Sequence, residues 1–257
     1  MSPHTRAQFF LLGNLYYTED MKLISEEFYH SYKKYCFGYK VLAELEPGDS
    51  IDNVYAAGFL PYSGSGAESP RYYMARSCRV LMDLFVPSSE NRRIMKKFEG
   101  RFTVTVEKAS AIANNREAID FCLDYFKKRH DEEVMDEQRL QYILNYSPET
   151  SVAIYRDNAE KIVAYVLENT GEKSSHFWFS FYDLYYAFQS LGLWLMLDRL
   201  SARQNEGISH CYLGTVYGEK ALYKTNFPGL EYWDGTSWQN DVEHLKSLAR
   251  SDAEREL

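Results

Sequence analysis

Paired cysteines are absent from this sequence. Its four cysteines, Cys36, Cys78, Cys122 and Cys211, are scattered, with no CxxC pair and no histidine at metal-ligand spacing. This pattern excludes the disulfide framework of a small secreted domain and gives no basis for a zinc or iron–sulfur site. We therefore expect reduced, mostly packed thiols in a cytoplasmic protein without a metal centre.

Long apolar runs are also absent. The patch from Phe9 to Leu12 is too short for the apolar core of a signal peptide. No run approaches the ~18 apolar residues that span a bilayer. The sequence thus predicts a soluble intracellular protein that does not enter a membrane.

An excess of positive charge is the third absence. The 29 Lys and Arg residues face 37 Asp and Glu residues, which gives a net charge of −8. The molecule as a whole does not attract nucleic acid, so any RNA contact must come from a local basic patch. Tyrosine, in contrast, is abundant, with 22 residues. These rings pack at seams between structural elements or offer stacking surfaces for nucleobases, and both interpretations stay open.

One basic cluster stands out against this acidic background. Ser88 and Ser89 follow Pro87 and are good N-cap residues, so a helix is expected directly after them. Residues three and four apart share a helix face, which gathers the cations of this segment. They form a solvated face or bind phosphates. The residues concerned are Arg92, Arg93, Lys96 and Lys97.

The chain divides by pattern into residues 1–110, a smaller α+β region, and residues 111–257. In the first part the apolar spacing predicts a helix between Thr18 and Lys40, and the small polar residues from Leu60 to Pro70 predict a loop. A strand is expected between that loop and Val86. The helix prediction uses Met21, Ile24, Phe28 and Tyr32.

The second part has a regular order of elements. The patterns predict helices, then a hairpin, then strands alternating with helices. This is the order of a GNAT acyltransferase core, although other α/β domains can imitate it. We therefore expect an α/β fold with a GNAT-like mixed sheet flanked by helices and a smaller N-terminal α+β region packed on it. The expected ranges are helices 114–130 and 136–145, hairpin 151–169, strand 174–183, helix 189–204, strand 210–216, helix 217–227, a closing strand or hairpin 230–240, and a charged tail helix from 242.

The segment FSFYDLYYAFQSLG carries the most chemical information. Its strand delivers Tyr182 and Asp183, and a short connection leads to Gln189, Ser190, Leu191 and Gly192 at a helix start. Amides at a helix N-terminus bind anions, and Gly lets a ligand approach closely. Q-x-x-G here resembles the pyrophosphate loop of GNAT enzymes, Q/R-x-x-G-x-G/A, and a packing Gly is the alternative. The last motif position is Trp194, whose bulk speaks against ordinary coenzyme A binding.

Three blocks together resemble the arginyl-tRNA–protein transferases and their bacterial leucyl-transferring relatives. YFKKRHDEEVMDEQRLQYILNYS is similar to Y-x-x-x-R-H-x-D-x-x-M, and SSHFWFSFYDLYYAFQSLG to S-S-x-Y-x-F-Y-D-P…S-L-G. YLGTVYGEKALYKTNFPGLEYWDGTSW is similar to Y-L-G-Y…K-M-x-Y-K-x-x-F-x-P-x-E with its closing G-x-x-W. VYAAGFLPYSGSG and SCR…PSSENRR match the family's first half more faintly.

The chain departs from this family at specific positions. The N-terminal cysteine cluster has no equivalent pair, and Cys78 stands alone in the later cysteine region. Leu60 and Pro61 replace a paired Arg, and Leu184 replaces the Pro after Asp183. The resemblance therefore implies the fold and the donor class more firmly than the acceptor.

The resemblance implies transfer of arginine or leucine from aminoacyl-tRNA to a protein N-terminus or a small amine, with no further cofactor. An aminoacyl ester is already activated, so positioning and a general base suffice. We predict that Asp183, beside Tyr182, binds or deprotonates the acceptor ammonium; capping of the following turn is the alternative.

The remaining predicted contacts are to tRNA and acceptor. Residues 189–192 would hold the 3′ end of the tRNA by their backbone amides. Arg129 and His130 would contact acceptor or tRNA, or only offset the helix dipole. Tyr223 and Lys224 would line the tRNA side, or only belong to a surface helix.

Two other function classes stay open on the sequence. The first is an acyl-coenzyme A-dependent N-acyltransferase of the same fold. The second is a non-catalytic module that binds tRNA or degrons, for which the missing cysteine cluster and the acidic net charge leave room.

Overall fold

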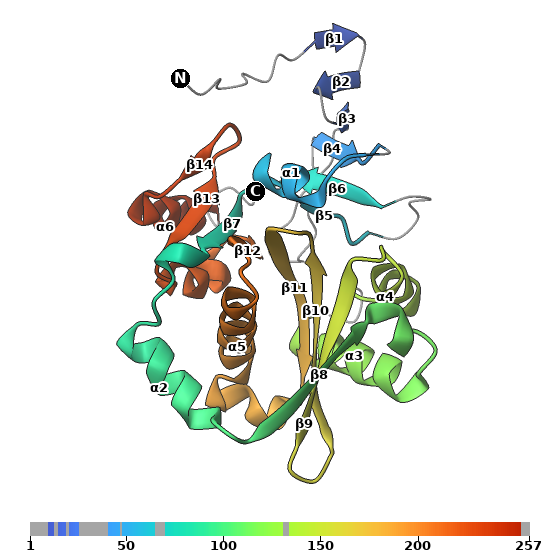
Figure 1. The fold of residues 1–257 in the computed structure, drawn as a ribbon, viewed down its shortest axis with the longest axis vertical. Coiled ribbons are helices and arrows are strands. Elements are labelled where there is room, and N and C mark those ends of the chain that lie inside the picture. Colours follow the sequence, from blue (N-terminus) through green and yellow to red (C-terminus); the bar gives the residue numbers. More distant parts are fainter. Residues whose placement is uncertain are drawn as a thin grey trace.

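The protein is described by a computed structural model covering residues 10–12, 15–18, 21–25, 41–46, 48–64, 70–130 and 134–252. Two sheets organise this part of the chain, a smaller one from the N-terminal strands at the top of Figure 1 and a larger one below it. Cys36, Phe28, Tyr32 and residues 65–69 of the expected loop lie outside the described residues.

The larger sheet has eight strands among the described residues, in the order β14-β13-β7-β12-β11-β10-β9-β8. Strands β8 to β11 form an antiparallel meander, and β12 then lies parallel to β11. Strand β7 enters from the N-terminal side and pairs between β12 and β13. The bounds are β7 Ser77–Leu81, β8 Phe102–Lys108, β9 Thr150–Asp157, β10 Ile162–Thr170, β11 Ser174–Tyr182, β12 His210–Thr215, β13 Leu230–Trp233 and β14 Trp238–Gln239.

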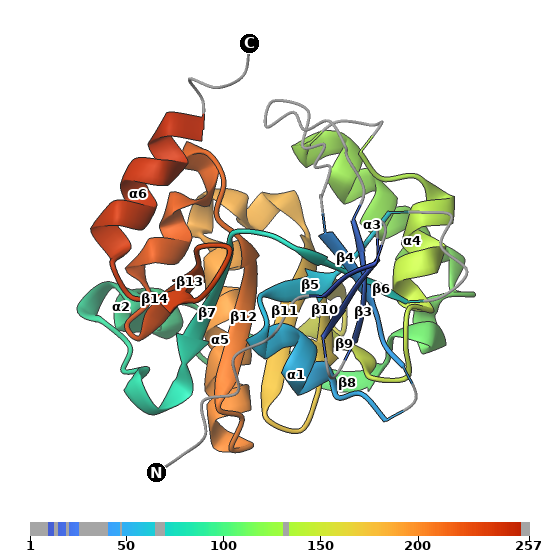
Figure 2. The same cartoon turned by 90° about the horizontal axis from the view of Figure 1, so that it is seen from above.

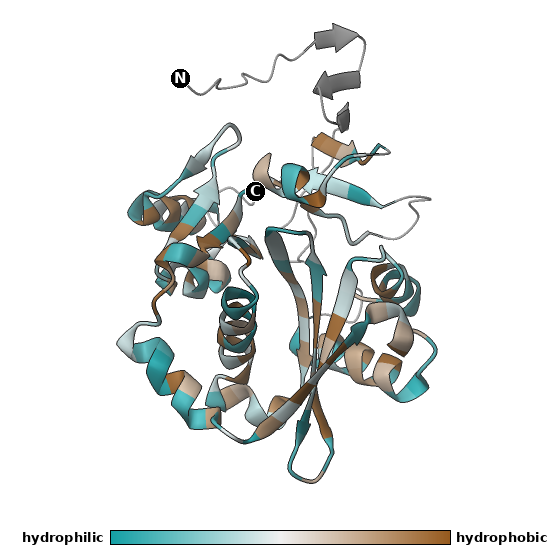
Figure 3. Cartoon of the chain, in the orientation of Figure 1, coloured by the Kyte–Doolittle hydropathy of each residue, from teal (hydrophilic) through white to brown (hydrophobic). Residues whose placement is uncertain are grey.

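Helices cover both faces of this sheet. The views place α2 (Ser89–Phe98) and α5 (Leu191–Asn205) on one face and α3 (Arg116–Arg129) and α4 (Glu137–Leu144) on the other (Figures 1 and 2). Strand β10 is accordingly buried at seven consecutive residues, as expected for a strand covered on both faces. Figure 3 shows the same division, with hydrophobic colour along the central strands and hydrophilic colour over much of α2. Helix α6 (Val242–Ser251) packs against the 3-10 segment η4 (Glu219–Asn226).

The smaller sheet follows the order β1-β2-β3-β4-β6-β5 in the described residues. Its helix α1 (Ile51–Ala56) brings Tyr55 against the larger sheet, where the Tyr55 hydroxyl donates to Asn169 Oδ1 at 2.7 Å. A tyrosine-rich core joins the two parts, with Tyr72 from the smaller sheet beside Tyr146 and Tyr212 from the larger unit. The bounds are β1 Phe10–Leu12, β2 Leu15–Thr18, β3 Met21–Ser25, β4 Val41–Glu44, β5 Phe59–Pro61 and β6 Arg71–Met74.

Most of the expected elements are confirmed. The mixed α/β fold with its flanking helices is present, and the Ser88 side chain caps α2 in a capping box with Asn91. Asn115, one residue beyond the expected Asn114, caps α3. The hairpin of β9 and β10 and the strand β11 lie where the β-branched and aromatic runs indicated.

Three sequence expectations need correction. Residues 21–25 form strand β3 instead of the start of a helix, because pairing with β2 and β4 outweighs the apolar spacing. Helix α5 begins at Leu191, two residues later than expected, because Ser190 adopts φ +69° and interrupts the helical path. Strand β8 was not foreseen; it is an edge strand whose Thr and Val alternation is mostly exposed.

The sheets do not separate at residue 110. Strands β7 and β8 and helix α2 lie before that residue and belong to the larger sheet and its cover. The division into residues 1–110 and 111–257 remains a prediction about independent folding units.

Candidate functional site at the divergence of two parallel strands

The parallel strands β11 and β12 pair for only three residues each. Ser174, Ser175 and His176 face His210, Cys211 and Tyr212. Beyond this point β11 continues to Tyr182 and β12 to Thr215 without further pairing between them. We call the point after His176 and Tyr212 the fork. Such a divergence of parallel strands at their carboxyl ends leaves main-chain groups free for a ligand.

A β-bulge on β11 sits directly beyond the fork. Leu167 of β10 faces Phe179 and Glu168 faces Phe177, so Trp178 is the additional residue. The bulge changes which side chains face α5: Phe177 packs against that helix, whereas Phe179 packs against Phe126 of α3. Bulges of this kind occur next to active sites because they redirect side chains.

Asp183 follows Tyr182, the last residue of β11, and caps the 3-10 turn η3 (Leu184–Gln189). Asp183 Oδ1 accepts from the Tyr185 amide at 3.0 Å, and Lys161 Nζ donates to Asp183 Oδ2 at 2.8 Å. Burial raises the pKa of the Asp183 carboxyl, but these two hydrogen bonds outweigh it and hold the pKa below its usual range. Of the two sequence interpretations of Asp183, the turn cap is the one whose hydrogen bonds are present.

The turn η3 leads into the N-terminus of α5. Ser190 lies in the left-handed region, and its carbonyl accepts the first helical hydrogen bond, from the Trp194 amide at 3.0 Å. The amides of Leu191, Gly192 and Leu193 precede that bond in the first turn and have no helical carbonyl to bind. These amides therefore form an anion-binding end of the helix.

Gly192 allows Tyr182 to approach this helix end. A Cβ on Gly192 would lie 3.0 Å from the Tyr182 ring and its hydroxyl oxygen. Gly192 is thus required for close packing of the last residue of β11 against α5. The sequence alternatives for this glycine, ligand approach and packing, are both compatible with this position.

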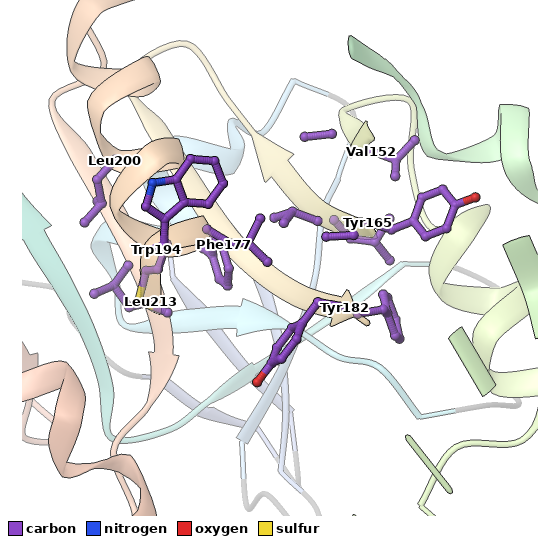
Figure 4. Packing of buried hydrophobic residues seen from close by; sticks show 14 of the residues in the cluster. Val152, Tyr165, Phe177, Tyr182, Trp194, Leu200 and Leu213 are labelled. Carbon is purple, nitrogen blue, oxygen red and sulfur yellow. The ribbon is translucent and has the colours of Figure 1, made fainter. Parts of the chain in front are cut away.

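The Trp194 side chain does not lie at the exposed N-terminal end of α5. Its ring lies in the core on the α5 side of the sheet, within 5.7 Å of the rings of Phe98, Phe102 and Tyr155 (Figure 4). The expected obstruction to coenzyme A by this side chain is therefore wrong: in a helix, the third residue after Leu191 turns inward to the core.

The C-terminal end of α3 meets the end of β11. The Tyr125 ring lies 4.9 Å from the Tyr182 ring, and burial, together with the neighbouring Tyr182, raises the pKa of Tyr125. His130 packs on Phe126 at 4.9 Å; desolvation and the charge of Arg129 lower the pKa of His130.

Segment η4 approaches this end of α3 from the other arm of the fork. The charge of Lys220 also lowers the pKa of His130, and Tyr223 contributes to raising the pKa of Tyr125. Three sequence-predicted groups therefore converge: Tyr182, the pair Arg129 and His130, and Tyr223. We call this place, with the α5 N-terminus, the fork mouth.

One residue of the basic cluster on α2 contacts the turn before α5. Lys97 Nζ donates to the Gln189 carbonyl oxygen at 3.0 Å, which connects the cluster to the turn before α5. Arg93 is paired with Glu90 on its own helix, and Arg92 donates to the Pro87 carbonyl. All four cations, Lys96 included, are exposed, so the expected shared solvent face is confirmed and phosphate binding stays a prediction.

A hollow of about 410 Å³ opens beside the fork mouth. It is bordered by the N-terminal turn of α2, by Leu193 of α5 and by Tyr223 and Phe227 of η4 and its end. The lining of the hollow thus includes Leu193, next to the N-terminus of α5, and Tyr223, which the sequence analysis had identified.

Two clusters of polar side chains lie buried in the larger sheet. On the α5 face, Glu168 accepts from Arg199 Nε and from an Arg203 nitrogen, each at 2.8 Å. On the opposite side of the fork, Lys224 Nζ donates to the Thr215 carbonyl at 2.8 Å near His176. Lys224 is partly buried and directed at β12, which differs from the surface-helix interpretation.

Comparison with known proteins gives the family of this region. Residues 117–234 match the family model described as arginine-tRNA-protein transferase, C terminus. This range begins in α3 and ends after β13, so it contains the whole fork. This part of the chain is therefore similar to the C-terminal region of the arginine-tRNA-protein transferases.

Curated relatives of the chain carry a related name. The aspartate/glutamate leucyltransferase of Hyphomonas neptunium is 28% identical over 207 residues, 76% of this chain and 81% of the relative. That of Paramagnetospirillum magneticum is 26% identical over 211 residues, 78% and 85% of the two chains. That of Dinoroseobacter shibae is 27% identical, and the match spans 63% of this chain and 61% of the relative.

Solved structures give more distant similarities. L-PGS from Bacillus licheniformis is 17% identical, with a TM-score of 0.42 over 64% of this chain and 49% of the other. The C-terminal domain of a putative lysylphosphatidylglycerol synthetase from Agrobacterium fabrum is 16% identical, with a TM-score of 0.45 over 79% and 68%.

The family model and the names of the relatives both indicate an aminoacyltransferase. The part of the chain described by the structure contains no cluster of three or more potential metal ligands and no helix able to cross a bilayer. Its three described cysteines are buried free thiols, as expected from their scattering.

The sequence analysis identified neither His176 nor Lys161, the ion-pair partner of Asp183. His176 is an isolated histidine within an aromatic strand, and its relation to Lys224 depends on the fork, which brings residues 48 positions apart together. Lys161, in the turn between β9 and β10, pairs with Asp183 just after the end of the neighbouring strand β11. Only the strand register connects these groups.

Proposed function

We propose that this aminoacyltransferase moves an aminoacyl group, leucyl or arginyl, from a charged tRNA onto the α-amine of a protein N-terminus. The observation that carries the proposal is the fork of β11 and β12 beside the open N-terminus of α5. The family description names arginine-tRNA, and the relatives are named for leucyl transfer to aspartate or glutamate. These names support a tRNA-borne donor and an acidic protein acceptor.

The donor end would lie across the α5 N-terminus. The amides of Leu191, Gly192 and Leu193 suit a phosphate of the tRNA 3′ end, since helix N-termini bind anions. Phe188 is 98% exposed and Tyr185 is 76% exposed on the adjoining turn. Exposed rings of this kind stack on unpaired bases, at about 1–3 kcal/mol per base. Lys97 adds positive charge at the same turn.

The terminal adenosine would occupy the hollow beside the fork mouth. About 410 Å³ is within the range of small-ligand sites, and Tyr223 and Phe227 supply aromatic walls. This placement directs the ester of the terminal ribose towards the fork, where the main chain of β11 and β12 is unpaired.

The reaction then requires orientation more than strong chemistry. The acceptor amine attacks the ester carbonyl carbon, the C–N bond forms, and the C–O bond to the ribose breaks. The ammonium loses one proton before attack and the nitrogen loses a second after it; the departing ribose oxygen takes up one, the other is released to solvent, and the amide keeps the third. Positioning can supply ~7–11 kcal/mol of the barrier reduction. Asp183, with its lowered pKa and its bond to Lys161, is poorly suited to removing a proton from the amine.

A transfer assay tests the proposal. Labelled leucyl-tRNA, arginyl-tRNA and a mixed aminoacyl-tRNA pool are each offered with peptides that begin with Asp, Glu, Arg or Lys. Label is expected on peptides with leucyl- or arginyl-tRNA and not with acetyl-coenzyme A as donor. Transfer from acetyl-coenzyme A alone, with no effect of charged tRNA, would identify the wrong donor.

A variant and its matched control test where the donor tRNA binds. Phe188→Ala removes the exposed ring from the turn, and Val106→Ala removes an exposed apolar side chain from β8 as the matched control. Loss of a base stack is expected to weaken tRNA binding about tenfold in Phe188→Ala. Equal binding by both variants would remove Phe188 from the tRNA site.

A further inference from the structure

A buried histidine without partners stands at the fork. His176 is the last residue of β11 that pairs with β12, and its side chain is 2% exposed. Neither ring nitrogen has a hydrogen-bond partner among the described residues. The ring is enclosed by the aromatic side chains of Tyr55 and Trp178. A buried imidazole always retains an N–H donor or an acceptor nitrogen, so this position is incomplete without a further polar group.

A lysine amine borders the same space. Lys224 Nζ reaches the carbonyl of Thr215, which lies on β12 beyond the last residue paired with β11. A Cβ on Gly214 would lie 3.4 Å from Lys224 Nζ and 3.9 Å from His176 Nε2. Both nitrogens therefore face the small space that the missing side chain of Gly214 leaves open.

The charge at this place is not balanced by a carboxylate of the described chain. The ionisable neighbour that acts on Lys224 is the Cys78 thiol, and the one that acts on His176 is Lys224. Burial lowers the pKa of Lys224, and burial with the Lys224 charge lowers that of His176 to about 3. A neutral imidazole thus lies near a partly buried amine, and the arrangement would gain from an anion.

We propose that Lys224 and His176 bind the side-chain carboxylate of an acidic residue at the acceptor's N-terminus. This rests on the proposed function, and it adds the residues that select the acceptor. A carboxylate has two oxygens: the Lys224 ammonium donates to one and a His176 N–H donates to the other. Such charge-assisted bonds are the strong ones in a site of low polarity. Tyr223, the residue before Lys224, borders the hollow assigned to the donor, so both substrates meet at the fork mouth.

The selection follows from the same groups. An acceptor that begins with Asn or Gln leaves the Lys224 ammonium without a counter-charge. One that begins with Lys or Arg adds a second positive charge beside it. Sites built from buried polar groups discriminate strongly because a wrong ligand leaves those groups unpaired.

The experiment compares kcat/KM for four peptides that begin with Asp, Asn, Glu or Gln, at saturating aminoacyl-tRNA. Lys224→Met keeps the length of the side chain and removes its charge. Lys220→Met is the matched control, because Lys220 lies exposed on the same segment. In Lys224→Met we expect kcat/KM for Asp and Glu peptides to fall about 100-fold, with less than about threefold change for Asn and Gln peptides. Lys220→Met is expected to retain the wild-type ratio.

His176 is tested in two substitutions. His176→Phe removes both nitrogens and is expected to lower the preference for acidic peptides about tenfold. His176→Gln keeps an N–H donor and is expected to recover part of that preference. Calorimetric binding of the Asp peptide in the absence of tRNA gives a second readout, expected to weaken in Lys224→Met and not in Lys220→Met.

The outcomes separate the two proposals. An equal loss of kcat/KM on acidic and amide peptides, or an unchanged ratio in Lys224→Met, would overturn the carboxylate site while transfer itself stands. Absence of transfer from any aminoacyl-tRNA by the wild-type protein would overturn both.

Discussion

Two of the buried polar clusters of the larger sheet, one on each side of the fork, differ in how completely they are paired. In the first, which we call the clamp, Glu168, Arg199 and Arg203 satisfy one another, and Arg203 also reaches Glu206. In the second, at the fork, His176 has no partner among the described residues and Lys224 has a single carbonyl. A buried group that is fully paired holds the fold, whereas one left incomplete indicates a ligand. The comparison assigns stability to the clamp and chemistry to the fork.

The clamp is tested most severely by Glu168→Gln. This change removes the shared anion, so buried Arg199 loses its ion pair and Arg203 keeps only its pair with Glu206. We expect the free energy of unfolding to fall by about 3–5 kcal/mol, measured by denaturant titration. Glu206→Gln is the control, because its carboxylate is half exposed and should contribute under about 1 kcal/mol. Similar effects of the two changes would contradict the role of the clamp.

The fork is expected to respond to acid. His176 is neutral when folded, with its pKa lowered to about 3 by burial and by the Lys224 charge, but takes up a proton near its ordinary pKa when unfolded. The unfolded state therefore binds more protons between these values, and stability decreases as the pH falls. The free energy of unfolding should decrease by about 1.4 kcal/mol per pH unit below about 6.5.

His176→Phe isolates this effect. The variant should lose that part of the slope, so it should gain about 2 kcal/mol over the wild type between pH 6.5 and pH 5. Denaturant titrations at pH 8, 6.5 and 5 measure it. Parallel pH curves for the two proteins would show that His176 is charged or solvated in the fold.

The fork mouth is expected to affect transfer more than stability. A Cβ in Gly192→Ala would press on Tyr182 at 3.0 Å, so the end of β11 must shift against α5. We expect transfer to slow about 10- to 100-fold, since small displacements at a reacting geometry are costly. The free energy of unfolding should change by less than about 1 kcal/mol, because Ala favours the helix.

The control for Gly192→Ala is Ser201→Ala, which lies further along α5. The Ser201 hydroxyl donates only to the Leu197 carbonyl of the same helix. Its substitution should leave the transfer rate unchanged. A loss of transfer in Ser201→Ala equal to that in Gly192→Ala would attribute both to the helix as a whole.

The smallest expected effect belongs to the surface of α2. Lys97→Gln removes the cation bound to the Gln189 carbonyl. Affinity for tRNA should fall a few-fold, and the slope of log K against log salt should decrease by about 1. Lys108→Gln on β8 is the control. An unchanged salt slope in Lys97→Gln would exclude a phosphate contact at this residue.

Local patterns were sufficient for much of the fold. Ser88 caps α2 and Asp136 caps α4 because short-range hydrogen bonds decide where a helix begins. Strand β3 was mistaken for a helix because its register depends on two neighbouring strands. The position of Trp194 was predicted by motif, yet its direction depends on the packing of α2 and β8 against α5.

Only the part of the candidate site that one continuous segment forms could be predicted from the sequence. Tyr182, Asp183 and Gly192 lie within one segment, so the motif placed them together. The meeting of α3 with η4 and the approach of His176 to Lys224 depend on the fork, which no local pattern encodes. Long-range strand pairing creates these contacts, and it has to be seen in the structure.

A photo-cross-link from the 3′ end of tRNA tests the central claim most directly. A tRNA with a photoreactive terminal adenosine is bound to the wild-type protein, irradiated, and the labelled peptides are identified by mass spectrometry. We predict labelling of residues 182–194 or 223–227, which border the fork mouth and the hollow beside it. Labelling confined to the outer strands β13 and β14 or to α4 would contradict the proposed site.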